Sequence, residues 1–215
     1  MKLKLHQVGE PVLRQIAREL TPEEIRTPQV QQLIEFMRDT MRDAPGVGLA
    51  APQVGESIQL AVIENRAEYA THSPETVLAE RERQPVPFHV IINPRMTISD
   101  STLVNHCEGC LSLTGFQAIV PRALAVRIAC LNEYGEPVNI DARGWYARIL
   151  QHEIDHLNGT LYIDRMDTRS FMTTQNHTRY WQNLPATGDS NQSGSIKSRY
   201  PNSAQERIEH HSTDL

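Results

Sequence analysis

The residues best suited to chemistry lie in the run His152-Glu153-Ile154-Asp155-His156. Two imidazoles four positions apart fall on the same face of a helix, so both can bind one metal ion while Glu153 lies beside it. A carboxylate next to a bound ion can take up and release protons during a reaction. This run therefore predicts a metal site that carries its own general acid and base.

A third ligand decides what kind of metal site this is. In the metzincin proteases the motif continues through a glycine to a third histidine, but here Tyr162 stands at the histidine position after Gly159. Several zincin-type donors farther along the chain stay open as alternatives: His177, Glu206, Glu209, His210 and His211.

A better candidate lies upstream, in the run Glu108-Gly109-Cys110-Leu111-Ser112. Cys110 follows a glycine in a stretch that reads as extended, so its thiol and the next backbone N–H are free to face one ligand. A thiolate and two imidazoles leave one position of a tetrahedral ion open for water, which is typical of a catalytic site. A small buried residue is the alternative interpretation of Cys110.

A third segment, Gly46-Val47-Gly48-Leu49-Ala50-Ala51-Pro52-Gln53, allows its backbone to approach a ligand closely. Gln53 adds an amide donor to it. The segment is not a nucleotide-binding loop, because no Gly-Lys-Ser/Thr follows and the glycine spacing does not match the dinucleotide fingerprint.

Two helices are predicted around these motifs. One begins at Thr27-Pro28, a cap residue followed by proline, and ends before Pro45. The other covers residues 145–158, which contain no Gly or Pro and repeat apolar residues at helical spacing up to Gly159. The second helix would carry both histidines and Glu153.

Short segments rich in β-branched residues predict strands at 58–64, 89–92, 118–120 and 125–130, with a hairpin turn over 132–137. Residues 66–87 are polar and interrupted by prolines, so we expect a peripheral inserted loop with one helical turn at most. The predicted fold class is α+β, with mixed or mainly antiparallel sheets around a central metal-binding helix.

The chain has 215 residues, which suits one catalytic domain over residues 1–182 followed by a polar, disordered tail over 183–215. The net charge of −5 predicts no specific nucleic-acid site, and the apolar runs are too short for a membrane span. Three cysteines without a disulfide pattern, and a start without a leader segment, predict a reduced cytoplasmic protein.

Taken together, the three motifs resemble the signature motifs of the peptide deformylases, which are Gly-x-Gly-Leu-Ala-Ala-x-Gln, Glu-Gly-Cys-Leu-Ser and Gln-His-Glu-x-Asp-His. They stand here at residues 46–53, 108–112 and 151–156, in the family's order. The similarity extends from about Val8 to Met166 and is greater to the branch that includes organellar enzymes, although no transit peptide accompanies it here. Asn105-His106-Cys107 departs from the pattern, because aromatic or apolar residues are expected there.

The resemblance implies a residue-by-residue assignment of the site. The metal ligands would be Cys110, His152 and His156, and Glu153 would be the general acid and base. Gln53 and the backbone N–H of Leu111 would hold the developing oxyanion.

The implied reaction is hydrolysis of the formyl group from the N-terminal formylmethionine of nascent polypeptides, with release of formate. The resemblance points to one Fe²⁺ ion, for which Zn²⁺, Ni²⁺ or Co²⁺ can substitute. The implied partners are N-formylmethionyl peptides and the ribosome near its exit tunnel.

Helical spacing adds candidates beyond the motifs. Trp145 and Ile149 share a stripe with His152, so they either form a pocket for the methionine side chain or belong to the ordinary core. Val47 and Gly48 are candidates for one edge of that pocket, with the Gly48 backbone pairing with an extended substrate.

Three charged residues are candidates for orienting a ligand histidine and the Cys110 loop, with surface ion pairs as the alternative: Glu108, Arg122 and Asp155. The remaining cysteines and several histidines are assigned to packing or surface positions: Cys107, Cys130, His6, His72, His89 and His106.

Two rival functions use the same residues. A zinc endopeptidase or another amidase requires a downstream histidine or carboxylate in place of Cys110. A non-catalytic protein with a structural zinc, or a relative that only docks at the ribosome, has no need of Glu153 beside the ion.

Overall fold

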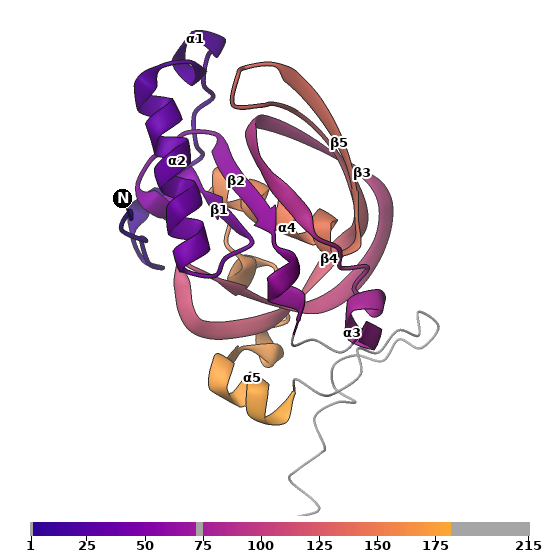
Figure 1. Ribbon diagram of the computed structural model, residues 1–215. Helices are drawn as coiled ribbons and strands as arrows, with labels where there is room; N and C mark the ends of the chain where they lie inside the picture. Colours follow the sequence, from indigo (N-terminus) through magenta and orange to yellow (C-terminus); the bar gives the residue numbers. More distant parts are fainter. Residues whose placement is uncertain (1, 72–74, 182–215) are drawn as a thin grey trace, which may run out of the picture. The chain divides into compact units, whose positions relative to one another are not determined.

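The computed structural model shown in Figure 1 describes residues 2–71 and 75–181 of the chain. The predicted tail over 183–215 and His72 lie outside the described residues. No helix in the described part of the chain is long and apolar enough to cross a membrane.

The helix predicted after Thr27 is α2 (Pro28–Asp43). Pro28 occupies the first turn, and the Thr27 hydroxyl accepts a hydrogen bond from the Val30 N–H at 3.4 Å. A cap of this kind stabilises a helix by about 1 kcal/mol. The buried residues of α2 are Ile34, Met37, Thr40 and Met41.

In the described part of the chain, six strands form one sheet in the order β1-β2-β3-β4-β5, with β6 paired to β4. Every strand pairing in it is antiparallel, which confirms the predicted α+β class with an antiparallel sheet. The strands are β1 (Gly48–Ala50), β2 (Leu60–Asn65), β3 (Val86–Cys110), β4 (Leu113–Leu131), β5 (Pro137–Arg143) and β6 (Met172–Thr173).

Strand β2 is buried on both faces because helices cover it from two sides (Figure 1). Leu60 and Val62 pack with the apolar face of α2, whereas Ala61 and Ile63 pack with the helix that carries the histidines. Full burial of a Val, Leu or Ile side chain contributes about 1.5–3 kcal/mol. β2 therefore contributes to both of these hydrophobic clusters.

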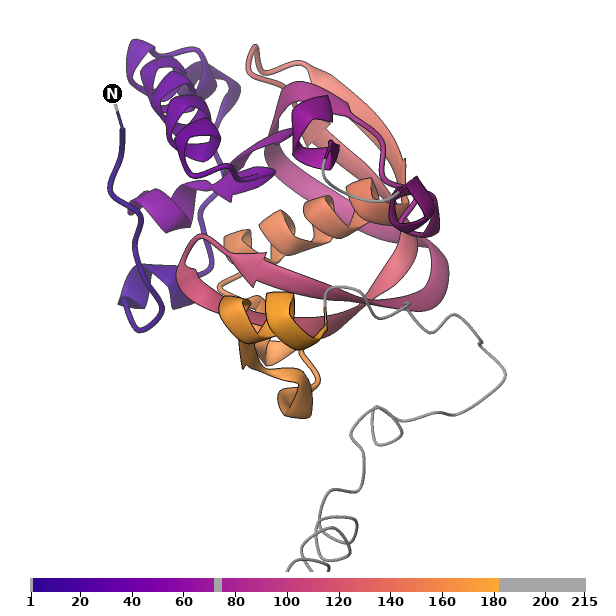
Figure 2. The same cartoon turned by 60° about the horizontal axis from the view of Figure 1, so that its bottom comes forward.

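The histidine-bearing helix is α4 (Gly144–Leu157), as the sequence predicts. Ten of its 14 residues are buried, so it is a core helix, and Figure 2 shows it running through the interior of the curved sheet. Gly159 follows the helix with φ +69°, and a Cβ there would lie 2.7 Å from the Arg14 carbonyl oxygen. Only glycine fits at this stop.

Two predicted strand boundaries are wrong. Segments 118–120 and 125–130 belong to the single strand β4, and 89–92 is only a short part of β3, which has 25 residues. The middle of β3 is largely exposed and its register with β4 shifts between Ile98, Asp100 and Leu103. Pairing with β4, and not local propensity, holds this stretch extended.

Residues 66–87 lie at the surface as predicted, since none of the described residues among them is buried, but the prediction of one helical turn at most is wrong. The segment contains η3 (Ala67–Ala70) and α3 (Glu75–Glu80) and then contacts the start of α4. The Arg81 carbonyl accepts the Trp145 N–H at 2.9 Å, and the guanidinium carbons of Arg81 and Arg83 lie 5.1 and 5.4 Å from the Trp145 ring centroid. The insertion therefore packs on a residue beside the candidate site.

The remaining short elements connect these parts: η1 (Pro11–Arg14), α1 (Pro22–Ile25), η2 (Ala51–Val54), η4 (Tyr162–Asp164), η5 (Thr168–Ser170) and α5 (Thr174–Tyr180).

Candidate metal centre

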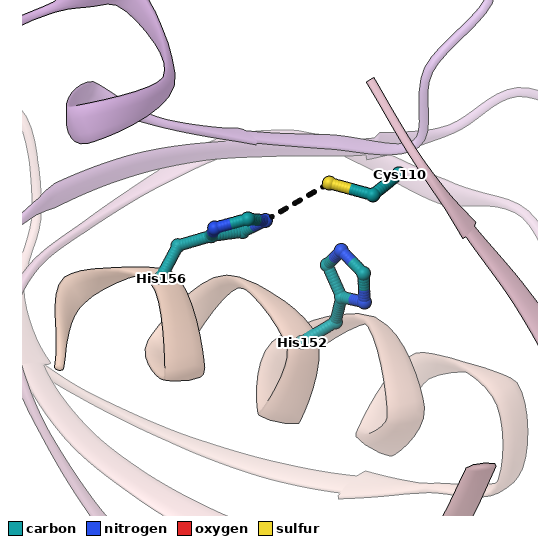
Figure 3. Close-up of side chains that lie close together, drawn as sticks. All are labelled: Cys110, His152 and His156. Atoms are coloured by element: carbon teal, nitrogen blue, oxygen red, sulfur yellow. Dashed lines mark hydrogen bonds between the residues drawn. The ribbon is translucent and has the colours of Figure 1, made fainter. Parts of the chain in front are cut away.

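Cys110 ends β3, where a two-residue turn leads into β4, and this hairpin end brings its thiol to α4. The Cys110 Sγ lies 3.2 Å from Nε2 of His156, and one ligand atom from each of Cys110, His152 and His156 lies within 4.8 Å of the others. Figure 3 shows both imidazoles rising from adjacent turns of α4 toward the sulfur. Among the described residues, no other His, Cys, Asp or Glu joins a group of this kind, so His177 is excluded as a ligand in this arrangement.

His152 is oriented by a carboxylate behind it. Its Nδ1 lies 2.9 Å from Oε2 of Glu108, which leaves Nε2 to face an ion. Burial alone would raise the pKa of Glu108, but hydrogen bonds from His152 and Arg122 hold that pKa far below its ordinary value. Glu108 is therefore a carboxylate that fixes both the orientation and the tautomer of the ligand.

Glu108 belongs to a buried ionic network. Arg122 donates to both of its oxygens at 2.9 and 3.0 Å, and Arg148 donates to Oε1 at 2.6 Å. Asp155 accepts from Arg122 and takes two more hydrogen bonds from Arg165 at 2.6 and 2.8 Å. These groups are not the surface pairs of the alternative interpretation, since Glu108, Arg122, Arg148 and Asp155 are all buried.

Glu153 is 4% exposed and its carboxyl group lies against Gly48. Burial raises the pKa of Glu153 to about 7, and its Oε2 has no hydrogen-bond partner in the described part of the chain. A Cβ added to Gly48 would lie 2.3 Å from Glu153 Oε1, so only glycine allows the carboxylate this position. An unpaired buried carboxylate next to a thiol and two imidazoles fits the surroundings of a catalytic divalent ion.

Gln53 is held in one orientation. Its Oε1 accepts from the Ala50 N–H at 2.9 Å, and its Nε2 donates to the Ser112 hydroxyl at 3.2 Å and lies 3.5 Å from the Cys110 sulfur. The turn that contains Leu111 is fixed from the other side, because Gln7 Nε2 donates to the Leu111 carbonyl at 3.0 Å. Both groups named by the resemblance as oxyanion donors therefore adjoin the thiol.

A cavity of about 570 Å³ opens over these residues. This volume lies in the range of roughly 300–1,000 Å³ that holds whole small molecules. Every residue predicted for the site lines it except His156, which lies deeper at 1% exposure. The lining residues from the prediction are Val47, Gly48, Gln53, Cys110, Leu111, Trp145, Ile149, His152 and Glu153.

Some residues of the site escaped the sequence reasoning. Arg148 lies on the same helical stripe as Trp145 and His152. A charged residue on the face of the helix predicted to be buried could have indicated that Arg148 belongs to the site. Cys107, which we assigned to packing or surface, lines the cavity. Its thiol donates to Gln117 Oε1 at 3.2 Å, and burial raises the pKa of Cys107 to about 11. It is therefore a neutral thiol in the cavity wall and not a nucleophile.

A His-Glu-x-x-His helix enclosed by a curved antiparallel sheet, with a hairpin thiol as third donor, defines a protein with a mononuclear metal site and a substrate-sized cavity. The model of the family described as polypeptide deformylase matches residues 2–171. The chain belongs to this family of metal-dependent hydrolases.

Relatives of the chain include organellar and bacterial proteins. A chloroplastic peptide deformylase 1A from Solanum lycopersicum is 44% identical over 170 residues, which are 79% of this chain and 61% of that protein. A mitochondrial peptide deformylase from Homo sapiens is 41% identical over 83% of this chain and 71% of its own length. The chain thus spans less than two thirds of the tomato relative.

Among solved structures, a class I type b peptide deformylase from Acinetobacter baumannii with Met-Ala-Ser bound matches with a TM-score of 0.68. It is 32% identical, and the match covers 77% of this chain and 99% of that one. The likeness therefore includes the whole of a bacterial enzyme fold.

Proposed function

We propose that this chain removes the formyl group from the N-terminal formylmethionine of newly made polypeptides and releases formate. The observation that carries the proposal is the unpaired, buried carboxylate of Glu153 beside a cluster of one thiol and two imidazoles. Membership of the polypeptide deformylase family supports it.

Cys110, His152 and His156 would hold the metal ion. When bound, the ion would polarise the formyl carbonyl and lower the pKa of a water molecule. We propose Fe²⁺ as the native ion, with Zn²⁺, Ni²⁺ or Co²⁺ as substitutes, because one thiolate and two imidazoles suit all four.

Glu153 moves the protons of the reaction. As a carboxylate it removes a proton from the attacking water, and as a carboxylic acid it delivers that proton to the amine nitrogen as the C–N bond breaks. Water and the formyl amide are thereby converted to formate and a free amino terminus. Burial, which raises the pKa of Glu153, favours its uptake of that proton.

Gln53 and Leu111 stabilise the charge that grows on the formyl oxygen. The Gln53 amide is held with its nitrogen toward Cys110, and the Leu111 N–H belongs to the turn that follows this thiol. Donors fixed in advance need no rearrangement as charge develops, and one such donor is commonly worth about 10²–10³-fold in kcat.

Trp145 and Ile149 form the wall of the methionine pocket, and Val47 and Gly48 form its opposite edge. All four line the cavity that holds Cys110 and Glu153. β1 is an edge strand with one side paired to β2, so the Gly48 backbone is placed to pair with an extended peptide. The bound Met-Ala-Ser of the Acinetobacter baumannii structure is a peptide of this chemistry.

The test is formate release from formyl-Met-Ala-Ser by protein purified anaerobically with ferrous iron. The intact protein should turn over, whereas Glu153→Ala should retain metal and lose at least about 10²-fold in kcat. Glu56→Gln, which removes an exposed carboxylate, is the matched control and should behave as the parent.

If the folded, metal-loaded parent releases no formate, the proposed deformylation is wrong. Cys110→Ser distinguishes the proposed deformylase site from an endopeptidase site that does not use Cys110 as a ligand. If Cys110 is a metal ligand, the variant should lose metal and activity together. Contact with the ribosome near its exit tunnel and a cytoplasmic location stay predictions.

A further inference from the structure

Two phenylalanine rings stand exposed beside the cavity. Phe116 and Phe171 are 40% and 42% exposed, and their rings stack with centroids 5.0 Å apart and 5° between their planes. Large aromatic rings supply much contact area at little entropic cost, so an exposed pair is a natural binding surface.

The chain holds this pair in place from both sides. Strand β6 pairs with β4 so that Thr173 lies opposite Phe116 and Met172 lies opposite Gln117. On the other side of Phe171, the Ser170 hydroxyl accepts the Ile119 N–H at 2.8 Å. These pairings on both sides of Phe171 place its ring against Phe116, and we call the two stacked rings the aromatic shelf.

The shelf is continuous with the candidate metal centre. Phe116 lines the cavity that also contains Cys110 and Glu153. The other exposed large apolar side chains in the described part of the chain do not line it: Val8, Ile16, Met96, Ile98, Leu103, Tyr134, Phe171 and Tyr180. Among the described residues, Phe116 is thus the one exposed aromatic side chain that lines the cavity.

The cavity wall around Phe116 carries no charge. Its neighbours along the wall are Thr114, Gly115, Gln117 and Thr174. Such a wall favours an apolar side chain over an acidic or basic one, while its hydroxyl and amide groups suit a peptide backbone. The cavity is also large enough to hold more than one methionine side chain.

We infer that the Phe116–Phe171 shelf is a subsite for an apolar or aromatic side chain of the formylated peptide, downstream of its formylmethionine. This inference rests on the proposed deformylation and adds a sequence preference to it. Because successive side chains of an extended peptide alternate in direction, one position after the methionine faces the shelf and its neighbours face away.

The test compares formyl-Met-Ala-Ala-Ala with three peptides that carry Phe at the second, third or fourth position. For the metal-loaded parent, Phe at one of these positions should raise kcat/KM by roughly three- to tenfold, mainly through a lower KM. Phe116→Ser should remove this gain, and Phe171→Ser, which loses only the stacking partner, should reduce it.

Tyr134→Ser is the matched control, because it removes an exposed aromatic ring in the turn between β4 and β5, away from the cavity. It should keep the parent's ratio of kcat/KM between Phe and Ala peptides. Thermal unfolding of each variant checks that the fold is retained, and Phe171 lies outside the strands, so its variant stays informative if Phe116→Ser does not fold.

If the parent deformylates the Ala peptide and shows no preference for Phe, the proposed Phe116–Phe171 subsite is wrong, whereas the proposed deformylation is supported. Retention of the preference in both Phe variants has the same consequence. If the parent releases no formate from any of the peptides, both the proposed deformylation and the proposed subsite are wrong.

Discussion

Gly48 and Glu153 are so close that the Glu153 side chain can take its position only because residue 48 has no side chain. An added Cβ at position 48 would meet three atoms of the Glu153 side chain within 2.7 Å. The glycine therefore has two functions in our proposal, since it makes room for the acid and base and offers its backbone to the substrate.

Gly48→Ala should displace the Glu153 carboxylate and lower kcat on the order of 100-fold, the cost of misplacing a catalytic group by about 1 Å. Steady-state kinetics together with metal content measure this. Gly109→Ala is the matched comparison, because its Cβ would make only an ordinary 3.5 Å contact with Gln117. Equal losses in both variants would contradict a specific clash with Glu153.

At the scale of elements, α4 was predictable and its surroundings were not. Motif spacing placed His152, His156 and Glu153 on one helix and made Cys110 a candidate third ligand. The resemblance then implied the oxyanion role of Gln53. The role of residues 66–87 was hidden, because a polar, proline-containing segment gives no local sign that two of its arginines will lie over Trp145. The lengths of β3 and β4 could not be predicted from the sequence either, because they depend on pairing between the strands and not on local propensity.

The insertion is expected to set the shape of the methionine pocket through Trp145. Arg81→Gln keeps the backbone hydrogen bond to Trp145 but removes a cation–π contact worth about 0.5–2 kcal/mol. The preference for formyl-Met-Ala-Ser over formyl-Leu-Ala-Ser, measured as a ratio of kcat/KM, should fall by roughly three- to tenfold.

Arg66→Gln supplies the control within the same insertion, since Arg66 lies over Tyr69 and pairs with Glu68. It should keep the parent's preference. An unchanged ratio in Arg81→Gln would mean that Trp145 is positioned by the sheet and α4 alone.

At the scale of the whole molecule, His106 gives folding stability a dependence on pH. This residue stands where we expected an aromatic or apolar residue, and it is 8% exposed with its ring edge-on to Trp145. Burial first, and then the charges of Arg148 and Arg81, lower the pKa of His106 to about 4, against the opposing charge of Glu108.

The unfolded chain binds this proton near pH 6.5 and the folded chain only near pH 4, so stability should fall as pH drops through that window. The loss from this residue is about 2 kcal/mol at pH 5. His106→Phe should remove it, which urea unfolding of parent and variant at pH 7.5 and pH 5 will measure. An identical pH dependence in the two proteins would show that His106 is protonated in the folded state.

The donors of the metal centre are far apart along the chain, since Cys110 and His156 are separated by 46 residues. Contacts of such separation form late in folding, after the loop between them has closed. During synthesis the thiol of Cys110 therefore emerges well before either imidazole can share an ion with it. Metal binding at this centre must therefore follow tertiary folding, and the interval before it is the period in which oxidation of this cysteine would do the most damage.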